Sequence, residues 1–234
     1  MRSKRPSIDT PPARGKARLL SLFALAAAAL LSGCATTVKD TSRTFTTVVI
    51  DAGHGGHDNG ATSRWAGREK DATLEVARRL EPKLRAAGFR TVMTRSSDRF
   101  IPLDKRARIS NSQGNAVFVS IHFNDTRKRS ISGTEVYYRS SCSRQIARKI
   151  LDEIDALPGA TSRGVKTANF RVLRRNHYPA VLVECGFLSN PSEGSRCATS
   201  AYRERLAGAI ATALVEQRHG KSAPPPPSAP VAGN

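Results

Sequence analysis

Short apolar runs alternate with helical patterns along the middle of this 234-residue chain. The apolar runs predict six strands, at 45–51, 89–94, 116–122, 133–138, 170–174 and 180–186. Apolar residues that recur every three or four positions predict helices at 69–87, 103–113, 143–157 and 201–218. This alternation favours one α/β domain whose mostly parallel, twisted sheet of about six strands has helices on both faces.

The first predicted helix shows the pattern most clearly. Leu74, Ala77, Leu80 and Leu84 fall on one face, and Gly88 marks its end. Pro82 lies inside the helical pattern, where proline removes a backbone donor and clashes with the preceding turn. The sequence therefore predicts a kink or an early break near this residue.

The N-terminus has the pattern of an export signal. Basic residues end at Arg18, and the apolar run at 19–32 is too short to span a bilayer but has the length of a signal-peptide core. The run ends in Leu-Ser-Gly-Cys at 31–34, which resembles the lipobox of bacterial lipoproteins, whose cysteine is lipidated. An ordinary secretory signal with a coincidental cysteine is the alternative, whereas the polar residues that follow disfavour a buried core helix.

We therefore expect a lipoprotein signal peptide at 1–33, a tether at 34–44 that is lipidated on Cys34, and a catalytic domain at 45–219. Residues 220–234 are rich in proline and predict a disordered tail. Ala35 stands where enteric lipoproteins of the inner membrane carry Asp. The expected location is the periplasmic face of a bacterial membrane, and the outer membrane is favoured.

The chain is strongly basic, with a formal net charge of +19 and a pI near 10.8. Such a charge attracts anionic surfaces, which include nucleic acid, the cell wall and lipid headgroups. No stacking aromatic residues are interleaved with the basic ones, and an exported protein does not meet nucleic acid. A nucleic-acid partner is therefore not expected.

Three cysteines remain besides Cys34, so at most one disulfide can form within the domain. An exported protein lies where disulfides are stable. Of the three, Cys142, Cys185 and Cys197, the last two are the candidate pair.

Polar groups that suit a metal centre follow the predicted strands. His54 lies in a glycine-rich loop after the first strand, His122 ends a later strand, and Glu69 begins a helix. In parallel sheets the ligand site lies beyond the carboxyl ends of the strands. Two imidazoles and one carboxylate form a recurring zinc shell that leaves the fourth position to water. Glu184, which follows three apolar residues near another strand end, then supplies a base.

Each residue alone also fits an ordinary role, such as a turn histidine or a helix-capping glutamate. The spacing leaves two questions open. It does not choose between His54 and His57 as the ligand in the first loop. It also does not say which glutamate binds the metal.

Four segments carry a resemblance to a known family: VVIDAGHGGHDNGA (48–61), REKDATLEVARRL (68–80), SIHFND (120–125) and PAVLVECGFLSNPSE (179–193). They resemble the zinc-dependent N-acetylmuramoyl-L-alanine amidases in the family's order and spacing. The resemblance implies that His54, Glu69 and His122 bind Zn²⁺ and that Glu184 is catalytic. It places His57 at a variable position and Asn124 in a loop that supports His122 or contacts substrate.

The resemblance implies hydrolysis of the amide between N-acetylmuramic acid and the L-alanine of the stem peptide in peptidoglycan. Residues 164–166 and Arg171 to Arg175 are candidates to meet the carboxylates of that peptide. We expect a monomer whose partners are peptidoglycan and, through the N-terminal lipid, a membrane. The alternatives are a zinc peptidase that cuts within stem peptides and a non-catalytic wall-binding lipoprotein.

Overall fold

A computed structural model describes residues 37–220 of the protein. The expected signal peptide and the lipidated Cys34 lie outside the described residues, as do residues 221–234 of the expected tail. Among the described helices, none has both the length and the apolar character needed to cross a bilayer.

Six strands form one sheet in the order β4-β1-β5-β8-β6-β7. Four of the five neighbouring pairs are parallel, and only β6 runs antiparallel to β8. A separate hairpin joins β2 (Thr62–Ser63) to β3 (Gly67–Arg68). The strands of the sheet are β1 (Thr47–Ala52), β4 (Arg90–Met93), β5 (Ala116–Asn124), β6 (Thr134–Tyr138), β7 (Ser162–Thr167) and β8 (Ala180–Phe187).

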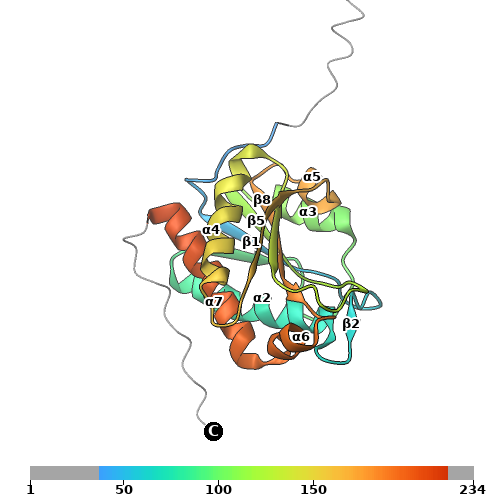
Figure 1. Cartoon of the computed structure of the whole chain (residues 1–234). Helices are drawn as coiled ribbons and strands as arrows, with labels where there is room; N and C mark the ends of the chain where they lie inside the picture. Colours follow the sequence, from blue (N-terminus) through green and yellow to red (C-terminus); the bar gives the residue numbers. More distant parts are fainter. Residues whose placement is uncertain (1–36, 221–234) are drawn as a thin grey trace, which may run out of the picture. The chain divides into compact units, whose positions relative to one another are not determined.

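Helices cover both faces of the sheet (Figure 1). The larger layer contains α2 (Glu69–Ala86), α4 (Arg144–Asp155), α6 (Pro191–Ala198) and α7 (Ser200–His219), and a 3₁₀ turn at Ser141–Ser143 precedes α4. The smaller layer contains α3 (Leu103–Asn111) and α5 (Arg171–Arg174). The expected α/β architecture with a mostly parallel six-stranded sheet is confirmed.

The core follows from the alternation of side chains along the central strands. Val48 and Ile50 of β1 face the larger helical layer, while Val49 faces the smaller one. All six residues of β1 are buried, as expected for a strand with helices on both faces. The carboxyl ends of β1 and β5 therefore meet at one edge of the sheet, with fixed neighbours on both faces.

One predicted strand is wrong. Residues 170–174 form the short helix α5 rather than a strand. A strand would turn the adjacent Val172 and Leu173 to opposite faces, whereas one helical turn buries both against the sheet. The sixth strand is instead β7, an edge strand without an apolar run, which is defined by its backbone pairing with β6.

Of the kink or early break predicted at Pro82, the break does not occur. Helix α2 continues past Pro82 to Ala86, and Leu84 in this last part is fully buried. Burial of a leucine side chain contributes about 1.5–3 kcal/mol, which is comparable to the cost of roughly 3 kcal/mol for an internal proline. Packing of the last turn against α7 therefore keeps the helix continuous.

The candidate disulfide is also absent. Cys185 and Cys197 are both buried free thiols, and Cys142 is a free thiol that is partly buried. Burial raises the pKa of Cys197 to about 12 and raises that of Cys185 as well, which makes both thiols poor nucleophiles. They pack as small apolar residues in the larger core.

Part of the expected tether is attached to the domain surface. The Thr41 hydroxyl donates to the carbonyl oxygen of Ala116. The backbone N–H of Lys39 donates to the carbonyl oxygen of His177. The Gln217 side chain of α7 donates to the carbonyl oxygen of Ser42. These contacts hold residues 39–44 against the ends of the strands where β5 and β8 begin.

Substitution of Ile150 should test the larger core. Ile150 is fully buried on α4, so Ile150→Ala leaves a cavity and should lower the free energy of unfolding by about 2–5 kcal/mol. Urea denaturation should show a lower midpoint at an unchanged slope. Arg148→Ala, on the exposed face of the same helix, is the control and should change stability by less than about 0.5 kcal/mol. Equal effects of the two substitutions would contradict this packing.

Candidate metal centre

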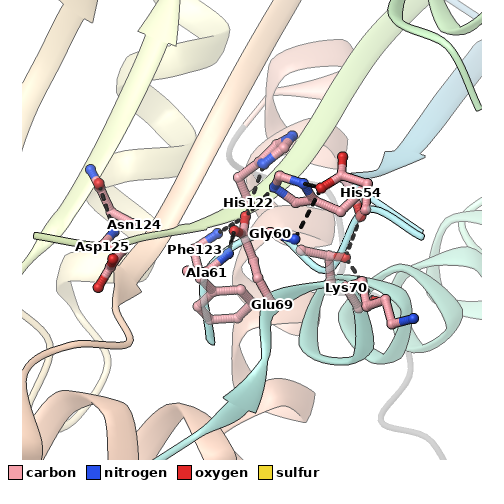
Figure 2. A network of polar contacts seen from close by, with 12 residues as sticks. His54, Gly60, Ala61, Glu69, Lys70, His122, Phe123, Asn124 and Asp125 are labelled. Carbon is pink, nitrogen blue, oxygen red and sulfur yellow. Dashed lines mark hydrogen bonds and ion pairs between the residues drawn. The ribbon is translucent and has the colours of Figure 1, made fainter. Parts of the chain in front are cut away.

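Two histidines and a glutamate meet at the carboxyl ends of β1 and β5 (Figure 2). His54 Nε2 lies 3.0 Å from Glu69 Oε1, and His122 Nδ1 lies 2.9 Å from the same oxygen. The candidate ligand atoms of the three residues all lie within 4.8 Å of one another. The structure therefore brings together the three residues expected to bind zinc.

Glu69 is fixed by the backbone of two segments. The backbone N–H of Ala61 donates to Oε2, and that of Phe123 donates to Oε1. The pairing between β5 and β8 shifts between His122 and Asn124, which leaves the Phe123 N–H free to reach Glu69. A bulge at the end of β5 thus helps to place the carboxylate beside both imidazoles.

Small residues make this close approach possible. A Cβ on Gly53 would lie 2.3 Å from His122 Cε1, and a Cβ on Gly60 would lie 2.5 Å from Glu69 Oε2. Both distances are too short for any side chain. These glycines leave the space that the second imidazole and the carboxylate occupy.

The first loop is held by two buried arginines that are not among the predicted site residues. Arg106 donates to the carbonyl oxygens of Ala52 and His54, and it pairs with Asp51 at 2.9 Å. Arg95 donates to the carbonyl oxygens of Ala52 and Gly53. Such fixation matters because His54 has a positive φ of 60°, which is an uncommon conformation for a residue other than glycine.

A sequence signal for one of these cations did exist. Arg106 lies next to Ala107 and four residues before Ser110, and these three form the buried side of α3. An arginine on a buried helix face needs partners for its guanidinium group, and carbonyl groups of a neighbouring loop provide them.

The orientations of the two histidine side chains distinguish His54 from His57 in the first loop. His54 Nδ1 donates to Asp58 Oδ1 at 2.9 Å, and the other ring nitrogen of His54 faces Glu69. His57 is exposed and its ring stacks against Phe100 with a centroid separation of 4.2 Å. His54, and not His57, therefore lies with the other candidate ligands.

The pKa values of Glu69 and Glu184 are shifted in opposite directions. Burial raises the pKa of Glu69, but the hydrogen bonds from His122 and His54 outweigh it and hold that pKa far below its ordinary range. At Glu184 burial instead prevails and raises the pKa to about 7, because its Oε2 is buried without a hydrogen-bond partner. Glu69 is thus a stable anion, whereas Glu184 can gain or lose a proton near neutral pH.

Glu184 stands beside the histidine of β5. In the parallel pairing of β5 with β8, His122 is the direct partner of Glu184. Glu69, His54, His122 and Glu184 all line one cavity of about 710 Å³. An acidic group with a raised pKa in the same cavity as a metal-ligand cluster is typical of a catalytic site.

Asn124 lies away from the cluster, next to Asp125 (Figure 2). Its amide Nδ2 donates to Glu135 Oε2 at 3.1 Å, and its Oδ1 accepts from the Asp125 backbone N–H. Both ends of the amide are therefore engaged, which suits a role in shaping the loop. Its role in substrate binding stays a prediction.

Two of the basic residues proposed from sequence to meet carboxylates already have acidic partners. Lys166 pairs with the buried Glu135, which also pairs with Arg163, and Arg171 forms two bonds to Asp104, at 2.7 and 2.6 Å. Burial raises the pKa of Glu135, but bonds from Lys166, Arg163 and Tyr137 outweigh it, so the pKa is lowered. These cations are largely neutralised within the protein.

Comparison with known proteins identifies the family of the chain. Residues 48–216 match the family model described as N-acetylmuramoyl-L-alanine amidase. The N-acetylmuramoyl-L-alanine amidase LytC of Bacillus subtilis is 37% identical over 168 residues, which is 70% of this chain and 34% of LytC. The probable cell wall amidase LytH of Staphylococcus epidermidis is 35% identical over 170 residues, which is 72% of this chain and 57% of LytH. The chain thus spans about a third of LytC and somewhat over half of LytH.

Solved structures show the same fold. The catalytic domain of CwlV, an N-acetylmuramoyl-L-alanine amidase from Bacillus (Paenibacillus) polymyxa, aligns with a TM-score of 0.70 at 36% identity and covers 74% of this chain and 97% of that domain. The amidase AmiC2 of Nostoc punctiforme also aligns with a TM-score of 0.70 at 36% identity, and covers 73% and 95%. From its sequence, its fold and its cluster of histidines and glutamates, this chain belongs to the N-acetylmuramoyl-L-alanine amidase family.

Proposed function

We propose that this protein is a zinc-dependent hydrolase of the amide bond between N-acetylmuramic acid and L-alanine in peptidoglycan. One observation carries the proposal: His54, Glu69 and His122 converge in the same cavity as Glu184, a carboxyl group with a raised pKa. Membership of the amidase family supports the reaction class and the substrate.

The donor set fits zinc. Two imidazole nitrogens and one carboxylate oxygen are typical of catalytic zinc sites, which leave a further position open. Asp58 accepts or shares the proton of His54 Nδ1, an arrangement that fixes the ring and directs its second nitrogen toward the cluster. When bound, zinc polarises the substrate carbonyl and lowers the pKa of a coordinated water.

Glu184 handles the proton in this reaction. Its carboxylate accepts a proton as the water oxygen forms a bond to the carbonyl carbon. It then gives that proton to the amine nitrogen as the carbon–nitrogen bond breaks, which leaves a free lactyl carboxylate and the amine of the stem peptide. A peptide amine is a poor leaving group without this proton, and a pKa near 7 suits both transfers.

One wall of the cavity suits the uncharged part of the substrate. Phe100, Leu103 and Phe170 are the exposed large apolar side chains of the described residues, and all three line the cavity on the side of α3 and α5. Exposed apolar side chains gathered around one cavity indicate a binding surface. The methyl groups and ring faces of N-acetylmuramic acid fit such a wall.

We propose further that the protein is a lipoprotein attached through Cys34 to the periplasmic face of a membrane, in particular the outer membrane. Support comes from the basic, apolar and Leu-Ser-Gly-Cys sequence of residues 1–34 alone. In that location the basic domain meets peptidoglycan directly.

Loss of a ligand should release the metal. His122→Ala should lose most bound zinc, measured as zinc per protein after dialysis, because one of three ligands is missing. His57→Ala is the matched control from the same site region and should keep its zinc. Zinc loss in the His57 variant with retention in the His122 variant would contradict the ligand set.

Glu184→Gln should separate chemistry from metal binding. The amide keeps the shape of the side chain but accepts no proton, so hydrolysis of purified sacculi should fall by roughly 10²–10⁴-fold while zinc content and fold are retained. Release of intact stem peptides by the unaltered enzyme, identified by mass spectrometry, distinguishes an amidase from a peptidase. Near-normal turnover by the variant would show that another group carries the proton.

The proposed lipidation of Cys34 is tested separately. Cell fractionation should place the mature chain with membranes, and Cys34→Ser should shift it to the soluble fraction or leave it as the unprocessed precursor. Mass spectrometry of the mature N-terminus should find an acylated cysteine. An unmodified N-terminus at another residue would overturn lipidation at Cys34.

A further inference from the structure

A second cleft begins where the catalytic cavity ends. It has a volume of about 320 Å³ and is lined by residues of the β2–β3 hairpin and of the loop after β5. Asp125 lines both hollows, so the two are neighbours at this residue. His122 lies only three residues before Asp125, a stretch of chain that spans roughly 10 Å at most.

Positive charge dominates this second cleft. Arg64, Arg127 and Arg129 line it together with the single carboxylate of Asp125. Within residues 37–220 no ion pair joins any of the three guanidinium groups to a carboxylate. The Arg64 guanidinium lies over the ring of Trp65 at 4.3 Å, which holds it at the cleft without neutralising it.

This charge contrasts with the other basic residues near the catalytic cavity. Lys166 and Arg163 are neutralised by Glu135, and Arg171 by Asp104. On the side of α3 and α5 the catalytic cavity is bordered instead by exposed apolar side chains. Among the cations that line the two hollows, those without a carboxylate partner therefore all line the second cleft.

We infer that the cleft formed by Arg64, Arg127 and Arg129 binds an acidic stem peptide and discriminates substrates by a carboxylate close to the scissile bond. This rests on the proposed amidase function. Two residues of extended peptide span roughly 7 Å, so a carboxylate on the second residue can reach the cleft while the first amide lies at Glu184. Arginine suits the task because its planar group binds carboxylates through two parallel hydrogen bonds.

A peptide bound in this cleft also determines how the whole substrate is oriented. The peptide extends toward the β2–β3 hairpin and the loop after β5, and the sugar toward α3 and α5. The arginine-lined cleft then receives the charged part of the substrate, and the apolar side of the catalytic cavity receives its uncharged part.

Two probes that differ in one carboxylate test this inference. They are the γ-methylamides of N-acetylmuramoyl-L-alanyl-D-glutamate and of N-acetylmuramoyl-L-alanyl-D-isoglutamine, so that only the α-carboxylate of the second residue differs, and each is offered to the zinc-loaded full chain. The unaltered enzyme should have a lower KM for the acidic probe at similar kcat. In Arg127→Ala/Arg129→Ala the KM for the acidic probe should rise roughly five- to tenfold, the scale of two partly exposed charge interactions, while the KM for the amide stays unchanged.

Charge reversal and a matched control sharpen the test. Arg127→Glu/Arg129→Glu should favour the amide probe over the acidic one, and added salt should reduce the preference of the unaltered enzyme. Arg148→Ala removes an exposed arginine from α4 and should leave both KM values unchanged. An equal rise in KM for both probes would overturn charge recognition, as would equal KM values in the unaltered enzyme.

Binding separates this inference from the proposed function. Dissociation constants of both probes with zinc-loaded Glu184→Gln should show the same preference for the carboxylate, with no hydrolysis needed. If the unaltered enzyme cleaves neither probe but the binding preference holds, the amidase proposal fails and the cleft assignment stands. If the arginine variants bind sacculi more weakly yet treat both probes as the unaltered enzyme does, the arginines serve wall attachment and the inference is overturned.

Discussion

The carboxylate of Glu69 is the constraint on which the site depends. It accepts from both imidazoles and from backbone N–H groups of Ala61 and Phe123, so it joins the first loop, the start of α2 and the end of β5. A buried anion is costly unless several donors satisfy it, and here four do so. Because the donors come from segments far apart in the sequence, the cluster forms only when β1, α2 and β5 are packed together.

A buried polar network beneath this cluster also fixes the first loop in place. Arg95 and Arg106 are buried against carbonyl oxygens of residues 52–54, and Asp51 accepts from Arg106, Thr94 and Ser120. Each of these groups would be expensive to bury alone, but together they satisfy one another. The left-handed conformation of His54 is held by this network.

Much of the fold and site could be predicted from sequence because the signals were local. The central strands show as β-branched runs, and His54, His122 and Glu184 were recognisable as polar residues at their ends. The choice of His54 over His57 needed the family resemblance, and the structure agrees because only His54 faces Glu69.

Other features depend on tertiary contacts and have weaker signals in the sequence. Strand β7 is polar and at the sheet edge, so only its pairing with β6 defines it. The pattern at 170–174 fits a strand or a turn of helix equally, and burial of two adjacent apolar residues on one face decided for the helix. Which arginines lack a partner cannot be read from sequence at all, because Arg171 and Arg127 look alike until Asp104 is seen beside the former.

The contacts of residues 39–44 fix where the chain enters the domain. Thr41 is bonded at the beginning of β5 and Lys39 just before β8, while His122 lies near the opposite end of β5 and His54 follows the corresponding end of β1. Residues 39–44 and the catalytic cavity therefore lie at opposite ends of the sheet, and this described segment leaves the cavity uncovered.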